Sequence, residues 1–284
     1  MTFPPLTTTD HNRTVAGLRY IYPVMSRRAG GLSIGINLNS NNACNWRCIY
    51  CQVPNLITGS APPLDNQLLA KELRFFLNEV LHGNFYDAYQ VPVEQRVIQD
   101  MAISGNGEPT SLKNFAEAVG LIAEIGRELK VLPASRYIVI SNGSLTHLPQ
   151  VQQGLKVLAQ YHGELWFKLD SGTNSGKKLI NQAAQTVEAG LNNLILAQQC
   201  CTTKIQTCLI NYDNQGLSSQ EAEALLTAFK FIKANTNIDE VMLYTIARQS
   251  HQPQAPLLTP LTAEVMHSFA ASVRHLGFNV IVSY

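Results

Sequence analysis

Short apolar runs alternate with longer amphipathic segments along most of the chain. The apolar runs predict strands at residues 32–38, 97–103, 137–140, 165–169, 205–210 and 241–246, with an edge strand at 278–282. Between them, apolar residues at helical spacing predict helices at residues 68–81, 112–129, 151–158, 178–191, 219–232 and 263–276. The chain therefore repeats a strand followed by a helix six times.

This repeated order is typical of an α/β protein whose parallel strands are joined by right-handed crossovers. Six units are fewer than the eight of a complete barrel, so the pattern leaves open a partial barrel or a doubly wound sheet. We expect a single domain at residues 30–284, preceded by an N-terminal extension at residues 1–29 that packs on it.

Composition narrows the class of protein. The hydrophobic content of 45% is ordinary for a globular core, and the net charge of +1 gives no electrostatic sign of a dedicated nucleic-acid binder. No run approaches the roughly 20 apolar residues that span a bilayer. The first residues lack the pattern of a secretory signal, and the six cysteines do not suggest a disulfide scaffold. We expect a cytoplasmic protein without a membrane partner.

Three of the cysteines stand together directly after the first predicted strand. Cys44, Cys48 and Cys51 form a C-x3-C-x2-C array, and Tyr50 precedes the last of them. Three thiolates are one short of the usual set that holds a 4Fe–4S cluster, so one iron would lack a protein ligand. An open coordination position is typical of a catalytic metal centre. The alternatives are structural zinc with a fourth ligand from elsewhere, or buried thiols that bind no metal.

The residues around the array carry a resemblance to a known family. The run from Cys44 to Cys51, Cys-Asn-Trp-Arg-Cys-Ile-Tyr-Cys, resembles the cluster motif of the radical SAM superfamily. The segment from Ser26 through Leu38 is similar to that of an uncharacterised radical SAM group related to the enzymes that make wyosine bases in tRNA. The resemblance implies a partial (β/α)6 barrel, a 4Fe–4S cluster and S-adenosylmethionine, with Tyr50 beside the cofactors. It also implies a 5′-deoxyadenosyl radical that abstracts hydrogen from a substrate.

The turn after the second predicted strand is a further candidate, because active sites of parallel α/β folds lie at the carboxyl ends of the strands. Its glycines would let the backbone approach a ligand closely, and its proline fixes the exit. The turn resembles the family's G-G-E-P motif, whose backbone binds the amino group of S-adenosylmethionine, with asparagine in place of the first glycine. A plain strand-to-helix turn is the alternative. The candidate residues are Gly105, Asn106, Gly107, Glu108 and Pro109.

Polar residues also end the later strands. The resemblance implies that Asn142, in a Ser-Asn-Gly sequence, lies near the ligand. Lys168 and Asp170 share one face of a strand. The resemblance implies that polar residues here meet the ligand's methionine carboxylate or ribose, and the alternative is a structural ion pair. Gln206 is a candidate contact in the fifth predicted strand, whereas we expect Tyr244 to pack in the barrel.

The hypothesis is a radical SAM enzyme that acts on an unidentified substrate, with a tRNA base as the leading candidate. An electron donor such as flavodoxin or ferredoxin is an expected partner. The alternatives are an enzyme of the glycyl-radical-activating type with a protein substrate, and a non-catalytic iron–sulfur or zinc-binding module. The remaining cysteines match no ferredoxin spacing, and we expect no second cluster at Cys200, Cys201 and Cys208.

Overall fold

The computed structural model describes residues 5–7, 13, 15–26 and 30–284. Eight strands form one curled sheet in the order β1-β2-β5-β6-β7-β8-β10-β12. Strands β1 and β2 pair antiparallel, and every later pair in this sheet is parallel. The strands are β1 (Ile21–Ser26), β2 (Gly31–Ile36), β5 (Ile98–Ile103), β6 (Arg136–Ser141), β7 (Glu164–Lys168), β8 (Thr202–Cys208), β10 (Glu240–Tyr244) and β12 (Asn279–Ser283).

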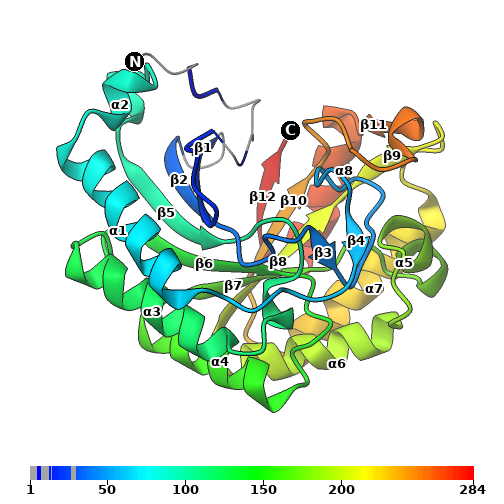
Figure 1. Cartoon of the computed structure of the whole chain (residues 1–284). Helices are drawn as coiled ribbons and strands as arrows, with labels where there is room; N and C mark the ends of the chain where they lie inside the picture. The colour runs from blue at the N-terminus through cyan, green and yellow to red at the C-terminus, as the bar shows by residue number, and fades with distance from the viewer. Residues whose placement is uncertain (1–4, 8–12, 14, 27–29) are drawn as a thin grey trace.

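Helices cover the outer side of the curled sheet (Figure 1). Several of the longer ones begin at side chains that accept a backbone N–H, as Asp65 does from Leu68 at 2.9 Å. The helices are α1 (Asn66–His82), α2 (Phe85–Ala88), α3 (Phe115–Glu128), α4 (Pro149–Gln160), α5 (Asn174–Ile180), α6 (Val187–Gln198), α7 (Ser219–Asn235) and α8 (Ala263–His275). Within the residues described, every helix is too short or too polar to cross a lipid bilayer.

Two small sheets and three single turns of 3-10 helix complete the fold. The pair β3 (Ala43–Cys44) and β4 (Ile57–Thr58) is parallel, and the pair β9 (Ile210–Tyr212) and β11 (Leu258–Pro260) is antiparallel. The 3-10 turns are η1 (Val93–Gln95), η2 (Pro109–Ser111) and η3 (Ala255–Leu257).

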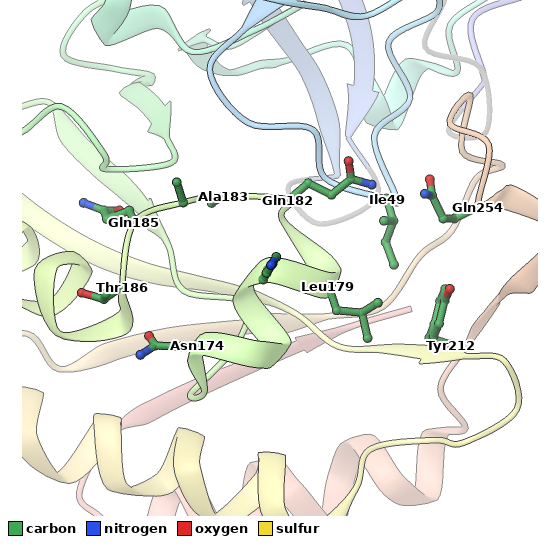
Figure 2. Close-up of a pocket in the computed structure, with 11 residues that line it drawn as sticks. Ile49, Asn174, Leu179, Gln182, Ala183, Gln185, Thr186, Tyr212 and Gln254 are labelled. Carbon is green, nitrogen blue, oxygen red and sulfur yellow. The ribbon is translucent and has the colours of Figure 1, made fainter.

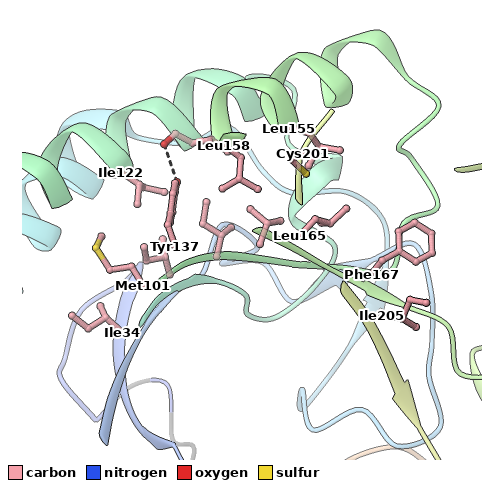
Figure 3. Close-up of a cluster of buried hydrophobic side chains, with 14 of the residues drawn as sticks. Ile34, Met101, Ile122, Tyr137, Leu155, Leu158, Leu165, Phe167, Cys201 and Ile205 are labelled. Atoms are coloured by element: carbon pink, nitrogen blue, oxygen red, sulfur yellow. Dashed lines mark hydrogen bonds between the residues drawn. The ribbon is translucent and has the colours of Figure 1, made fainter. Parts of the chain in front are cut away.

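The main core lies between the sheet and its helices. Successive strands contribute outward-facing side chains such as Ile34, Met101 and Leu165, all fully buried (Figure 3). The Tyr137 hydroxyl donates to the backbone oxygen of Val119 at 2.8 Å, which ties β6 to α3 (Figure 3). Because side chains alternate along a strand, the neighbouring residues face the concave side, where polar groups and a small apolar cluster line the hollow of the barrel.

The predicted fold class is confirmed: the chain is an α/β protein with a curled, partial barrel. The edge strand predicted at residues 278–282 is present as β12. The helix predicted at residues 178–191 is wrong, since α5 ends at Ile180 and α6 begins at Val187. The backbone between these helices bonds instead to the loop that carries the cysteines, where the amide N–H of Arg47 donates to the Asn181 carbonyl.

Strand β1 was also missed, and it lies inside the segment predicted as an N-terminal extension. It forms an edge of the sheet, with Ile21 opposite Ile36 and Ser26 opposite Gly31. The division of the chain into residues 1–29 and 30–284 stays a prediction.

Candidate functional site

A cavity of about 470 Å³ occupies the concave side of the sheet. Charged and aromatic side chains line it together with several of the candidate residues, so its wall is unlike a closed barrel core. The candidate residues in its wall are Cys48, Tyr50, Cys51, Gly105, Gly107 and Gln206.

The loop from Cys44 to Cys51 is held at this cavity by backbone hydrogen bonds. Its N–H groups at Arg47 and Ile49 donate to the carbonyls of Asn181 and Ile180 at 3.1 and 2.8 Å. The Ser250 hydroxyl also donates to the Ile49 carbonyl, at 2.7 Å. The loop is therefore positioned by two segments that lie far from it in the sequence.

The three loop cysteines lie close enough to influence one another's ionisation. Burial raises the pKa of Cys44 to about 12, and Glu108, Cys48 and Cys51 add to the effect. Burial, followed by Asp170, raises the pKa of Cys48 to about 12 as well, and burial also raises the pKa of Cys51. The free thiols are thus protonated at neutral pH, and a bound metal would displace those protons.

Nitrogen donors already point at two of these sulfurs. The Asn181 side-chain amide lies 3.3 Å from Cys48 Sγ, and the Trp46 backbone N–H lies 3.5 Å from Cys44 Sγ. Such donors suit thiolate ligands. No group of three His, Cys, Asp or Glu side chains within the described residues is placed to hold a metal ion. The ligation of a cluster by the three cysteines stays a prediction.

The turn from Gly105 to Pro109 packs directly against the cysteine loop. A Cβ atom on Gly107 would lie 1.9 Å from the Ala43 carbonyl oxygen, so a side chain there would collide with the backbone next to Cys44. The Asn39 side-chain amide bridges the two segments by donating to Ala43 O at 2.9 Å and to Glu108 O at 3.3 Å. The glycine at position 107 is thus required for contact between two segments of this chain, before any ligand is considered.

The Glu108 side chain points away from the cavity and is buried. It accepts hydrogen bonds from the Ser141 hydroxyl and the Asn142 backbone N–H, each at 2.7 Å, and burial raises its pKa. Pro109 opens η2, and the Asn106 backbone N–H donates to Asn37 Oδ1 at 3.0 Å. These three residues shape the turn, and their contact with a cofactor stays a prediction.

Lys168 and Asp170 form an ion pair of 2.9 Å, the structural alternative considered from the sequence. The Asp170 side chain has no exposure, and it also accepts from the Cys208 backbone N–H at 2.9 Å and from the Tyr50 hydroxyl. Lys168 Nζ bonds the Tyr244 hydroxyl and lies 5.1 Å from the centre of the Tyr50 ring. The pair thus braces the aromatic residue of the cysteine loop, and a direct cofactor contact by either residue stays a prediction.

Asn142 and Gln206 have different surroundings. The Asn142 amide donates to Asn45 Oδ1 at 2.8 Å, so it fixes the cysteine loop to the end of β6. Gln206 is 5% exposed in the cavity wall, and its side-chain amide bonds no other described residue. A free amide that faces a cavity is suited to a ligand.

A second hollow, of about 710 Å³, lies on the other side of the cysteine loop. Figure 2 shows Ile49 and Leu179 facing it, with Gln182, Tyr212 and Gln254 around its rim. Since Cys48 and Tyr50 line the first cavity and Ile49 lines this one, the cysteine loop forms a wall between the two.

Comparison of the sequence with known proteins gives only partial matches. No established family profile matches the chain. A segment of 135 residues, 47% of the chain, is 32% identical to a "UPF0026 protein" of Helicobacter pylori. The aligned segment covers 38% of that relative, so the chain spans less than half the length of the curated relative it matches.

Solved structures match over more of the chain. A radical SAM methyltransferase from Sphaerobacter thermophilus matches all of it and 78% of its own length, with a TM-score of 0.62 and 16% identity. TYW1 with a lysine-pyruvate adduct bound matches 86% of this chain and 73% of its own, with a TM-score of 0.55 and 16% identity. The chain has the radical SAM fold.

Several residues that position the cysteine loop in this radical SAM fold were not predicted from the sequence. Asn181 is separated from Cys48 by 133 positions and Ser250 from Ile49 by 201. Arg13, which bonds the Asn106 side chain and lines the cavity, comes from the segment before β1. Local spacing carries no signal for such contacts, because only the folded, curled sheet brings these segments together.

Proposed function

We propose that this protein is a radical SAM enzyme in which Cys44, Cys48 and Cys51 hold a 4Fe–4S cluster at the concave cavity. The observation that supports this most is the joint placement of Cys48, Cys51 and the glycine turn in one cavity wall of a radical SAM fold. When bound, the cluster would supply the electron that cleaves S-adenosylmethionine to methionine and a 5′-deoxyadenosyl radical.

The chain's own residues would bind and orient the cosubstrate. The turn at Gly105 and Gly107 brings its backbone into the cavity wall, where peptide groups can bond an amino group. Gln206 offers a donor and an acceptor to the same space. Tyr50, braced by Asp170 and Lys168, closes the side beside the cysteines.

We propose a tRNA base as the substrate, on the chemistry of the cavity wall. Arg136 lies 5.9 Å from the Trp166 ring centre, and Arg13 lies 5.6 Å from that of Tyr22, so planar cationic and aromatic groups line the space. Unstacked bases bind to such surfaces by stacking and by hydrogen bonds along their edges. The described lining contains no lysine, so the proposal does not include a lysine adduct of the kind bound in TYW1.

We also propose a cytoplasmic location and an electron donor of the flavodoxin or ferredoxin type, because the reaction needs a low-potential electron in a reducing compartment.

The proposed activity is tested with protein purified and reconstituted without oxygen. With a strong chemical reductant, the wild type should convert S-adenosylmethionine to 5′-deoxyadenosine and methionine even without substrate. Serine at Cys48 should abolish the product, whereas serine at Cys200, which is half-buried just after α6, should not. Stoichiometric zinc without iron, or a reduced iron-loaded protein that fails to bind S-adenosylmethionine, would contradict the proposal. The substrate is tested separately, by comparing modified nucleosides of tRNA from cells with and without the gene.

A further inference from the structure

Among the described residues, Asn181 is the one outside the cysteine loop whose side chain bonds the sulfur of a loop cysteine. It follows the last residue of α5 and is 1% exposed. Its side-chain nitrogen lies 3.3 Å from Cys48 Sγ and 2.8 Å from Asp170 Oδ2. Its backbone carbonyl accepts from the Arg47 N–H at 3.1 Å, so the side chain and the backbone both contact the same short loop.

The orientation of the Asn181 amide is determined by its neighbours. An amide can present either its oxygen or its NH2 group in one direction, and the choice follows from the hydrogen-bond network. Turning the oxygen toward Asp170 and Cys48 would set it against a carboxylate and a sulfur, both acceptors. With the nitrogen in that place, each of its two N–H groups has an acceptor. Asp170 is held in turn by its ion pair with Lys168 at 2.9 Å, so the whole chain of contacts is fixed.

We propose that Asn181 is a positioning residue that raises the reduction potential of the cluster through its hydrogen bond to Cys48, and that Asp170 keeps its amide in the donating orientation. This inference rests on the proposed function. Reduction adds one electron from the external donor to the cluster, and no bond to Asn181 forms or breaks. Because the added charge is spread onto the sulfurs, an N–H directed at one of them stabilises the reduced state more than the oxidised state.

The three cysteines are not equivalent in this respect. Cys44 Sγ receives a backbone N–H, from Trp46, which a substitution does not remove. The donor to Cys48 belongs to a side chain and can be removed without touching a cysteine. A substitution at Asn181 therefore tests the reduction potential of the cluster while the three cysteine ligands stay in place.

The test compares Asn181→Leu with the wild type, both reconstituted with iron and sulfide without oxygen. Leucine keeps the approximate volume and removes the N–H. We expect the equilibrium constant for reduction of the cluster to be about tenfold lower in Asn181→Leu than in the wild type, which is the scale of one charge-assisted hydrogen bond. For a one-electron couple this corresponds to a midpoint potential lower by about 59 mV. The readout is the midpoint potential from a redox titration followed by electron paramagnetic resonance, which does not depend on turnover.

A matched control is Asn193→Leu. Asn193 is equally an asparagine that is almost fully buried, but its amide donates to the carbonyls of Gly143 and Ser144 at 2.8 and 3.0 Å and bonds no cysteine. The midpoint potential of the cluster in Asn193→Leu should equal that in the wild type. Asn181→Ser, a smaller change at the same position, gives a second measurement and should also lower the potential.

The outcomes separate this inference from the proposed function. A wild-type protein that takes up no iron would overturn both. If the wild type and Asn181→Leu both bind iron and have the same midpoint potential, the role of Asn181 is overturned and the proposed function is not. Loss of the cluster in both Asn181 variants, with the cluster retained in the Asn193→Leu control, would make Asn181 a purely structural residue and would also overturn it.

Discussion

Replacing Gly107 by alanine tests the contact between the two segments that line the cavity. The added Cβ would lie 1.9 Å from the Ala43 oxygen and 2.7 Å from the Asn39 side-chain nitrogen. Because the nearer obstacle is backbone, either the turn or the cysteine loop has to move. Forced overpacking costs about 1–3 kcal/mol. Separating the bridging amide of Asn39 from Ala43 costs about 1 kcal/mol more. We expect the free energy of unfolding to fall by about 2–4 kcal/mol.

The assay is urea denaturation of the metal-free protein, followed by measurement of iron after reconstitution. Since the displaced backbone adjoins Cys44, the Gly107→Ala variant should also bind less iron than the wild type. Gly120→Ala is the matched control, because a Cβ on this glycine of α3 would meet its nearest atom at 3.7 Å, an ordinary contact. Alanine in the middle of a helix should stabilise the control by about 0.5–1 kcal/mol.

The two variants are thus expected to change stability in opposite directions. Wild-type stability and iron content in Gly107→Ala would refute the reasoning, since they would mean that the Ala43 carbonyl does not lie against the turn.

The remaining predictions concern charge and metal. Asp170→Asn should lower the free energy of unfolding by about 3–5 kcal/mol, because Lys168 would stay buried without its partner. The double variant with Lys168→Met should recover part of that loss in the same urea assay, and a double variant no more stable than the single one would argue against the pair. Burial lowers the pKa of Lys177 to about 8, against an opposing effect of Asp170. Between pH 8 and the pKa of about 10.5 that Lys177 has in the unfolded chain, the unfolded state binds more protons than the folded state. The free energy of unfolding of the wild type, relative to that of Lys177→Met, should therefore rise with pH, by at most about 1.4 kcal/mol per pH unit. A difference that stays flat from pH 7.5 to 9.5 would contradict it. In iron analysis of single serine variants, the cluster should be lost when the change is at Cys44, Cys48 or Cys51. It should be retained when the change is at Cys200, Cys201 or Cys208.

Much of the fold was predictable because its signals are local. Helices and parallel strands bury regular faces, so the apolar periodicity located α1, α3, α4, α7 and α8 and the parallel strands of the sheet. The missed helix boundary has a different cause. Residues 181–186 continue a helical pattern, but their backbone bonds to the cysteine loop, and this tertiary contact outweighs local preference. Strand β1 was missed because it forms by pairing with β2 at the edge of the sheet, and no local pattern in the sequence shows which segment pairs there.

The sequence alone determined which residues are candidates to hold a metal or bind a ligand. The spacing of Cys44, Cys48 and Cys51 and the glycine turn after β5 are covalent facts, and a parallel fold brings strand ends together whatever its details. Only the tertiary structure decided what each side chain does there. It turned Glu108 away from the cavity, buried Asp170 among its donors and brought Asn181 to Cys48 across 133 positions. The physical reason is that hydrogen bonds and burial depend on distances in space, which strand and helix periodicity leave undetermined until the barrel has formed.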